Sequence, residues 1–458
     1  MTLENNDIYR RALQFQERRY FCTPNSVNYL VIRIKGDVSE DLLKKAIFKC
    51  QTRHKLLQAR VFIKEKSDIW LTNEKFKDIE FESIQRKNDN QWLEKCIFEN
   101  SVYFDYYSQP LIKFILIYSK EISELIIKTD HMFADGLGFS YLARDLFEFL
   151  ENPSKKVEIL RPPPLVNKDI IPSDVSDNVF AKKVIKYVNK RWKKNQLILT
   201  KEDYRELFDS YWNKYKTKYE QINLTKKQTT KLLYLCKKHK VTVNTVLFTA
   251  LIRAQSDIVS NKQKKGGISL STRDRLNENL DGLYGFYATG IFLSFKNNPN
   301  KSFWEQAKDF HKKFNEKLNK KTYLINLLRF NQLDSSINDG IIVKMFGDII
   351  SDKYKNFDKL STYSKKKDVV SFILNWTVNK HFDFGLTNLG SIDLKEKYGD
   401  LNIDRVYYLP HTSPSTDIIL SAVSSSGKLS IGIAYIENII ERSTIYKVKR
   451  YLKELLEL

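Results

Sequence analysis

The residues best suited to chemistry lie in one short stretch, Thr129 to Gly138 (TDHMFADGLG). His131 is followed there by Asp135 and Gly136. An imidazole titrates near neutral pH and can take a proton from a hydroxyl or an amine. We expect the Asp135 carboxylate to hold the loop and Gly136 to let the backbone turn without a Cβ clash. The pattern indicates acid–base chemistry, and the alternative is a histidine satisfied within the core.

The flanking sequence predicts the elements that position this stretch. Residues 111–118 and 122–128 are apolar runs separated by a short polar turn, a pattern typical of two antiparallel strands. Apolar side chains recur at helical spacing over 137–150. We therefore expect His131 at the end of a strand and Asp135 just before an amphipathic helix.

Strand and helix patterns alternate along the rest of the chain. Ser39, Thr225 and Ser302 are residue types that cap helices, and each precedes a helical pattern. The other expected strands are 25–35, 56–63, 69–71, 79–81, 267–272, 284–295, 406–409, 417–424 and 429–435. Further helices are expected at 91–98, 245–254 and 440–456. This order predicts an α+β fold with sheets at its centre.

Prolines mark the expected division of the chain. Five of the ten prolines fall between residues 151 and 175, so this stretch cannot be a regular helix and we interpret it as a linker. A basic, aromatic helical region follows. The predicted organisation is an N-terminal half over 1–175, a basic linker or crossover region over 176–220, and a C-terminal half over 221–458.

Composition narrows the class of protein. With 458 residues, 42% of them hydrophobic, the chain is long enough for two domains with a core. No apolar run is long enough to cross a membrane, and residues 1–7 are polar, unlike a signal peptide. The four cysteines are scattered, without a C-x-x-C pair. We expect a cytoplasmic protein with reduced, mostly buried thiols and no bound metal.

The charge is strongly positive and uneven. The net charge is +22, and residues 181–240 hold 18 Lys and Arg against 5 Asp and Glu. The excess of Lys, Asn and Ile is also what a low-GC genome produces. The alternative is attraction to an anionic partner: coenzyme A, an acidic carrier protein or an anionic membrane surface. No zinc-finger, RNA-recognition or helix-turn-helix signature accompanies the charge, so we expect no nucleic-acid partner.

Five segments resemble, in order along the chain, motifs of the coenzyme-A-dependent acyltransferase superfamily. This superfamily includes chloramphenicol acetyltransferase, wax ester synthases, microbial alcohol acetyltransferases and the condensation domains of peptide synthetases. The stretch from His131 to Gly136 resembles its HxxxDG motif. The other similar segments are 53–60 (RHKLLQAR), 241–248 (VTVNTVLF), 269–276 (SLSTRDRL) with Gly285-Phe286 after it, and 387–390 (TNLG). Together they cover nearly the whole chain.

Two departures narrow the branch that the resemblance implies. Condensation domains usually carry a second histidine directly before the catalytic one, and here that residue is Asp130. Plant members of the superfamily carry the motif DFGWG, and residues 383–387 (DFGLT) match only its first three residues. Both point to a free-standing enzyme of the microbial alcohol acetyltransferase, wax-ester or polyketide-associated acyltransferase type.

The resemblance implies a fold and a reaction. The fold would be two chloramphenicol-acetyltransferase-like α/β sandwich halves forming a V-shaped pseudo-dimer within one monomer, with the site between them. The reaction would move an acyl group from an acyl-CoA thioester to an alcohol, with an amine as the alternative acceptor. Acyl-CoA would be a co-substrate, and no cofactor would be bound permanently. Attack would be direct, without an acyl-enzyme.

The resemblance also implies roles for individual residues. His131 would be the general base, and Asp135 would point away from the substrates and hold the loop against Arg273. Gly136 would supply the turn, and nearby backbone N–H groups would serve the oxyanion. Asn388 and Gly390 would shape the channel where the halves meet.

Several alternatives remain open at this point. A metal held by His131 and Asp135 would need a third ligand that the neighbouring sequence does not offer. A condensation-type, amide-forming enzyme with a carrier-bound donor is the nearest alternative function, and a non-catalytic binding protein on the same fold is another. The other histidines are expected to be structural or exposed: His54, His239, His311, His381 and His411.

Overall fold

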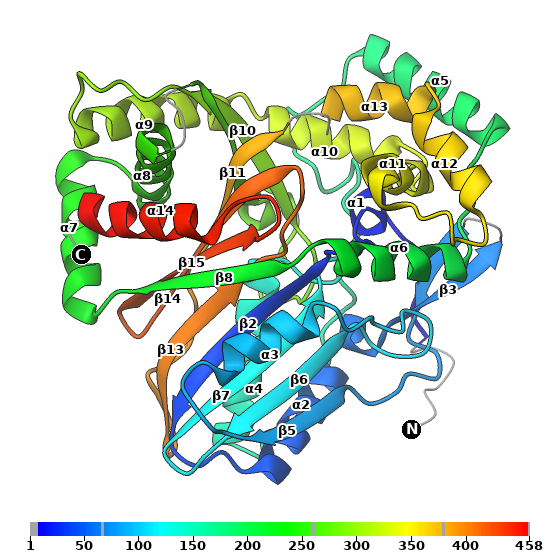
Figure 1. Cartoon of the computed structure of the whole chain (residues 1–458). Coiled ribbons are helices and arrows are strands. Elements are labelled where there is room, and N and C mark those ends of the chain that lie inside the picture. Colours follow the sequence, from blue (N-terminus) through cyan, green and yellow to red (C-terminus); the bar gives the residue numbers. More distant parts are fainter. Residues whose placement is uncertain (1–7, 66–67, 259–261, 378–380, 457–458) are drawn as a thin grey trace.

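The structure, a computed structural model, describes residues 8–65, 68–258, 262–377 and 381–456. In this part of the chain two six-stranded sheets form the framework, and helices cover them (Figure 1). The expected α+β fold with two α/β units is confirmed. Residues 1–7, interpreted above as unlike a signal peptide, lie outside the described residues.

The first sheet carries the strand that ends at His131. Its strand order is β12-β13-β2-β7-β6-β5, and all neighbours are antiparallel except β5 and β6. The strands are β12 (Lys397–Tyr398), β13 (Leu401–Leu409), β2 (Val27–Lys35), β7 (Ile122–Asp130), β6 (Ile112–Tyr118) and β5 (Glu80–Gln85). Helices α2 (Glu40–Arg53) and α4 (Gly136–Glu151) pack against each other, and α3 (Gln91–Glu99) contacts β7.

The second sheet has the order β10-β9-β11-β14-β15-β8, and β11 runs parallel to both of its neighbours. Its strands are β10 (Ala288–Phe295), β9 (Lys264–Ser271), β11 (Phe382–Ser391), β14 (Thr416–Ser425), β15 (Lys428–Ile436) and β8 (Thr217–Asn223). The accompanying helices are α7 (Lys226–His239), α8 (Val243–Ile258), α9 (Phe303–Asn319) and α14 (Arg442–Leu455). Thr225 and Ser302 cap α7 and α9, as their residue types predict.

Strand β13 comes from the C-terminal part of the chain but belongs to the first sheet. It pairs with β2, with Tyr407 opposite Val31, and it also contacts β14 and β15 of the second sheet. Conversely, β8 lies partly within the predicted linker 176–220 and pairs in the second sheet. The domain boundaries stay a prediction. β13 and β8 nevertheless pair in other sheets than those boundaries imply, because local sequence does not specify a distant pairing partner.

Two predicted strands are shorter than expected. Residues 55–58 form a 3-10 helix, and β3 (Arg60–Glu65) begins after it. β3 belongs to a small sheet with β4 (Asp68–Thr72) and β1 (Arg10–Ala12). The strand expected over 284–295 starts only at Ala288, since the carbonyl of Gly285 and the N–H of Tyr287 bind side chains instead of a neighbouring strand.

A helical layer links the two units. It contains α1 (Phe15–Arg18), α5 (Val179–Lys194), α6 (Lys201–Lys214), α10 (Thr322–Gln332), α11 (Ile337–Met345), α12 (Phe357–Lys365) and α13 (Val369–Thr377). The aromatic residues Trp192, Tyr204 and Tyr211 are buried in the same core as the first sheet. The aromatic residues of the predicted basic region therefore pack into this core. Residues 152–178 contain neither helix nor strand, as the prolines require.

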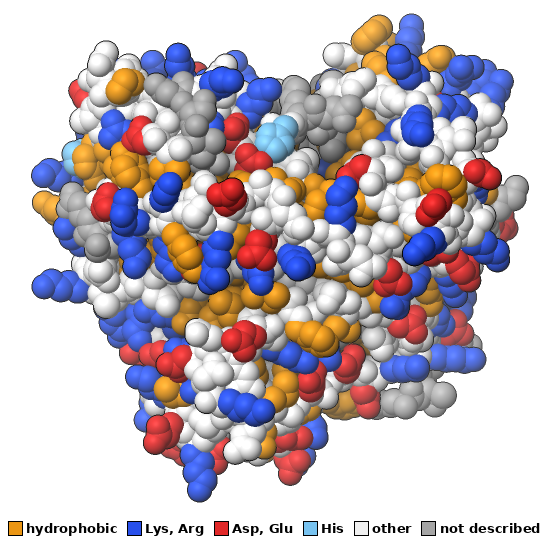
Figure 2. Space-filling view, viewed as in Figure 1, with side chains coloured by type: hydrophobic (Ala, Val, Ile, Leu, Met, Phe, Trp, Pro, Cys, Tyr) orange, Lys and Arg blue, Asp and Glu red, His pale blue; other side chains and the backbone are white. Residues whose placement is uncertain are grey.

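The surface of α5 is strongly basic. The helix carries seven Lys and Arg and no Asp or Glu, and Val179, Phe180 and Tyr187 are exposed on it. Figure 2 shows Lys and Arg side chains over the helices at the upper right of this face. An anionic partner for this surface stays a prediction. No helix in the described residues is long and apolar enough to cross a membrane. All four cysteines are free and buried, as expected.

The packing of Gly36, which follows β2, against the β12–β13 hairpin can be tested by substitution. Its φ is +117°, and an added Cβ would lie 3.0 Å from the carbonyl oxygen of Asp400. We expect Gly36→Ala to lower the free energy of unfolding by about 2–4 kcal/mol, through backbone strain and this contact. Gly399, at φ +57° with open space around it, is the matched control. Gly399→Ala should cost only about 1 kcal/mol in the same urea titration, and equal costs would contradict the predicted contact.

Candidate active site

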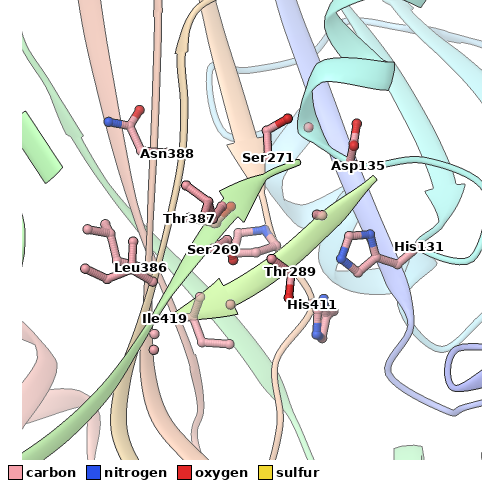
Figure 3. Close-up of a pocket in the computed structure, with 18 of the residues that line it drawn as sticks. His131, Asp135, Ser269, Ser271, Thr289, Leu386, Thr387, Asn388, His411 and Ile419 are labelled. Atoms are coloured by element: carbon pink, nitrogen blue, oxygen red, sulfur yellow. The ribbon is translucent and has the colours of Figure 1, made fainter. Parts of the chain in front are cut away.

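His131 lies where β7 ends and its loop turns toward α4. Its backbone N–H donates to the carbonyl of Ser26 at 2.8 Å, and its Nδ1 lies 2.9 Å from the carbonyl oxygen of Ala134. A carbonyl only accepts, so Nδ1 carries the proton of the neutral ring. The lone pair of Nε2 is then left for a substrate, which is the tautomer that a general base requires. Figure 3 shows this imidazole on the wall of a cavity.

Asp130, at the position where condensation domains usually carry another histidine, is fully buried. The hydroxyls of Ser26 and Tyr106 donate to its carboxylate, as does the N–H of Met132 at 2.9 Å. Burial raises the pKa of Asp130 to about 6. Its oxygens are occupied by these three donors, so its role is to fix the start of the loop.

Asp135 joins the loop of the first sheet to the second sheet. Its carboxylate accepts from the Arg273 guanidinium at 3.0 Å, and both side chains are buried. It also accepts from the N–H groups of Gly138 at 2.7 Å and Tyr287 at 2.9 Å. The contact with Arg273, expected from the sequence, is present. In Figure 3 the carboxylate points away from the His411 side of the cavity.

Arg273 has its remaining donors satisfied by backbone carbonyls. Its Nη1 donates to Leu280 at 3.0 Å and Leu283 at 2.9 Å, and its Nη2 donates to Gly285 at 2.8 Å. The N–H of Asp135 also donates to the Gly285 carbonyl, at 3.2 Å. We call Asp135, Arg273, Gly285 and Tyr287 the inter-sheet clasp. It fixes the position of the His131 loop relative to the second sheet.

Gly136 is needed for space and not for its backbone conformation. It is the first residue of α4 and is not among the described glycines with positive φ. A Cβ there would lie 2.6 Å from Cγ of Leu389, which packs over it from β11. Gly136 was expected to supply a turn through its backbone freedom, and this explanation is wrong. The glycine allows a side chain of the second sheet to approach the loop closely.

A second contact holds α4. Asp145 on this helix accepts from Arg53 Nε at 2.7 Å, and its carboxylate lies 2.9 Å from Nε2 of His54. Burial lowers the pKa of His54. Arg53 and His54 are the first two residues of the segment RHKLLQAR. The part of the chain that resembles this family motif therefore helps to hold α4 in place. His54 is structural, as expected, and His381 is exposed beside Asp417.

Two neighbouring cavities share lining residues, and His131 lines the larger of them. The larger, of about 550 Å³, is lined by His131, the start of α4 and strands β9, β10 and β11. Asn388 and Gly390 line it, and their role in a substrate channel stays a prediction. The smaller, of about 350 Å³, lies toward α10 and α11. Tyr20 and His411 line both cavities.

His411 was expected to be structural or exposed, but it is a site residue. It follows β13, and its ring centroid is 5.1 Å from that of His131. Its Nδ1 lies 3.3 Å from Oδ1 of Asn28. The signal in the sequence was its place directly after a predicted strand. Its position beside His131 could not be predicted, because it depends on the pairing of β13 with the first sheet.

Aromatic rings complete the surroundings of His131. The ring centroid of Tyr20 is 4.5 Å from the imidazole and that of Phe286 is 5.1 Å from it. Burial lowers the pKa of His131 to about 4, and the hydrogen bond to Ala134 offsets only part of this effect. Burial also lowers the pKa of His411 to about 3. Both imidazoles are therefore neutral at physiological pH.

No group of three His, Cys, Asp or Glu side chains that could hold a metal ion occurs within the described residues. Asp135 is already bound by Arg273 and by backbone N–H groups. The chemistry that this site can perform with its own residues is proton transfer to a neutral imidazole.

The lowered pKa of His131 predicts the pH dependence of catalysis. The base form is the neutral ring, and its loss on acidification should follow a midpoint near pH 4 instead of 6.5. We expect kcat/KM to stay constant from pH 7 down to about pH 5 in the variant Asp130→Asn, which removes the neighbouring carboxyl with a pKa of about 6. If kcat/KM of the natural protein changes near pH 6 and this change is absent in Asp130→Asn, the titrating group is Asp130. A loss of kcat/KM with a midpoint near 6.5 in both proteins would contradict the assignment.

The inter-sheet clasp predicts strong coupling between Asp135 and Arg273. Asp135→Ala leaves a buried guanidinium without its counter-charge and should lower the free energy of unfolding by about 3–5 kcal/mol. The double variant with Arg273→Met should recover part of this loss, because no unpaired charge remains. Glu454→Ala, which breaks an exposed ion pair with Arg450, is the control and should cost less than about 1 kcal/mol. Additive effects at Asp135 and Arg273 in denaturant titrations would show that the pair is not coupled.

Comparison with solved structures places this geometry among known folds. The chain is similar to TRI3 trichothecene 15-O-acetyltransferase from Fusarium sporotrichioides, with a TM-score of 0.69 and 11% identity over 99% of this chain and 96% of that one. It is also similar to the epimerization domain from the third module of tyrocidine synthetase B, with a TM-score of 0.63 and 15% identity over 98% and 95% of the two chains. Polyketide synthase associated protein 5 from Mycobacterium tuberculosis gives a TM-score of 0.60 and 14% identity over 97% and 98%.

These likenesses concern the fold. No curated protein matches the chain in sequence. The sequence model of the Condensation domain matches residues 11–458, which include both sheets, the His131 loop and the inter-sheet clasp. The chain therefore belongs to the condensation-domain family.

Proposed function

We propose that the protein is an acyltransferase that moves an acyl group from an acyl-CoA thioester to the hydroxyl of a small molecule. The observation that carries the proposal is the state of His131. Its Nδ1–H is bound to the Ala134 carbonyl, its ring is kept neutral by burial, and it lines a cavity of about 550 Å³. A thioester is already activated, so the base needs only to deprotonate the acceptor.

The reaction follows from this geometry. Nε2 of His131 takes the hydroxyl proton while the acceptor oxygen attacks the thioester carbon, and a C–O bond forms. The C–S bond of the tetrahedral intermediate then breaks. The sulfur leaves with the proton from the imidazolium, so the products are an ester and free coenzyme A. No group of the protein becomes acylated.

The first turn of α4 supplies candidates for stabilising the oxyanion. The N–H groups of Gly136 and Leu137 belong to helix positions that have no acceptor within the helix, and both residues line the larger cavity. The partial positive charge of a helix N-terminus favours a developing negative charge. The N–H of Gly138, one residue further, is already bound to Asp135.

One of the proteins with a similar fold, TRI3, is by name an O-acetyltransferase, which supports a hydroxyl acceptor. The match to the Condensation domain supports a second candidate, an amide-forming enzyme that takes its donor from a carrier protein. Donor competition separates the two. An enzyme that requires a carrier-bound donor will not turn over free acyl-CoA, whereas the proposed enzyme will.

Removal of the base should abolish most of the activity. We expect His131→Ala to lower kcat for acyl-CoA and alcohol by about 10²- to 10⁴-fold, measured by release of the coenzyme A thiol. His239 stacks on Trp304 and lines neither cavity, so His239→Ala is the control variant, with unchanged kcat expected. Full turnover by His131→Ala would contradict the proposed mechanism.

A further inference from the structure

Two consecutive arginines near the site differ completely in their surroundings. Arg18 is buried, and its guanidinium donates to Asp339 at 2.8 Å and to the hydroxyl of Tyr204 at 3.3 Å. Arg19 is exposed, and no side-chain hydrogen bond or ion pair connects it to any described residue. The first arginine is part of the framework, whereas the second has five donors and a charge available for a ligand.

Arg19 lies at the junction of the two cavities. It lines both of them, and it directly precedes Tyr20. The ring of Tyr20 contacts both imidazoles, with centroid distances of 4.5 Å to His131 and 5.7 Å to His411. The charge of Arg19 contributes, after burial, to the lowered pKa of both histidines. A group bound by Arg19 would therefore lie beside the reacting atoms.

A second polar side chain faces the same space. Asn326 on α10 also lines both cavities, and no hydrogen bond of its side-chain amide is recorded within the described part of the chain. The end of α1 that carries Arg19 is held near α10 by the stacked rings of Phe15 and Phe330, whose centroids are 5.6 Å apart. The guanidinium and the amide come from two packed helices and present N–H donors to one region.

The charges of the other lining residues are balanced. In the larger cavity Asp135 is paired with Arg273, and in the smaller one Arg329 is paired with Asp177 at 2.8 Å. Among the described lining residues, Arg19 therefore gives the junction an unbalanced positive charge. A cavity lined by an unbalanced charge of one sign attracts a ligand of the opposite sign, here an anion.

We propose that Arg19, assisted by Asn326, binds a carboxylate of the acceptor, so that the acceptor carries a carboxylate close to its nucleophilic hydroxyl or amine. A guanidinium binds a carboxylate through two parallel hydrogen bonds, which would orient the acceptor as well as hold it. The inference rests on the acyl transfer proposed above and specifies its acceptor class.

The phosphates of coenzyme A do not suit this position. They lie at the far end of the pantetheine arm from the thioester, whereas Arg19 lines the same cavity as His131 and His411. The remaining anionic source on the donor side is a carboxylate within the acyl group. We assign the anion to the acceptor because the smaller cavity, which Arg19 also lines, offers a separate place for a small molecule.

The test compares acids with their neutral esters as acceptors. A panel of hydroxy acids of increasing chain length, and the methyl ester of each, is supplied with one acyl-CoA. We expect kcat/KM to favour at least one acid over its ester by about 10- to 100-fold. The variant Arg19→Met should reduce this ratio toward one, and Arg19→Lys should keep part of it. Arg450→Met, at an exposed arginine of α14, is the control and should leave the ratio unchanged.

Each result distinguishes this inference from the proposed function. Turnover of esters and acids at equal kcat/KM by the natural protein would overturn the acceptor assignment and leave acyl transfer intact. An equal loss of kcat for acids and esters in Arg19→Met would also overturn it, since the arginine would then act on the reaction. A preference for succinyl-CoA over butyryl-CoA without any preference among acceptors would place the anion on the donor.

Binding measurements decide the case in which no acyl-CoA is turned over. Calorimetric titration of the same acids and esters into the natural protein and into Arg19→Met needs no chemistry. Binding of an acid, but not of its ester, by the natural protein alone supports the subsite. No binding of any acid overturns it. The same comparison with amino acids and their methyl esters shows whether the nucleophile beside the carboxylate is a hydroxyl or an amine.

Discussion

The buried ion pair between Asp135 and Arg273 is the interaction on which the site depends. It joins the loop after β7 in the first sheet to the short helix after β9 in the second. Burying both charges is costly unless every donor is satisfied, and here three backbone carbonyls take the remaining donors of Arg273. The pair fixes the loop, the loop fixes the Ala134 carbonyl, and this carbonyl selects the tautomer of His131. A base in one sheet is therefore oriented by a charge held in the other.

The surroundings of His131 are assembled from segments that are far apart in sequence. Tyr20, Phe286 and His411 reach its imidazole from the N-terminal segment, the loop before β10 and the end of β13. They reduce the contact of the ring with water and so favour its neutral form, which makes the base available but removes positive charge from the reaction centre. Arg19 restores one positive charge at the edge of this apolar shell, where both cavities meet.

Features set by local sequence were predictable, and those set by distant pairing were not. The strand–loop–helix around His131 and the caps of Ser39, Thr225 and Ser302 depend on neighbouring residues, and the structure contains all of them. The pairing of β13 with β2 depends on tertiary contacts. Local sequence preferences therefore could not predict that this C-terminal strand joins the first sheet, or that His411 lies beside His131. The motif drew attention to Gly136, but the contact that requires a glycine there is with Leu389, more than two hundred residues away.

The central claim is that His131 is a neutral base with its proton on Nδ1. Nitrogen-15 NMR of histidine-labelled protein, with His131 assigned from the spectrum of His131→Ala, measures this state directly. The account predicts a neutral ring from pH 5 to pH 8, with the chemical shift of a protonated Nδ1 and of an Nε2 that carries a lone pair. A ring that becomes charged with a midpoint near 6.5, or a neutral ring with its proton on Nε2, would contradict it.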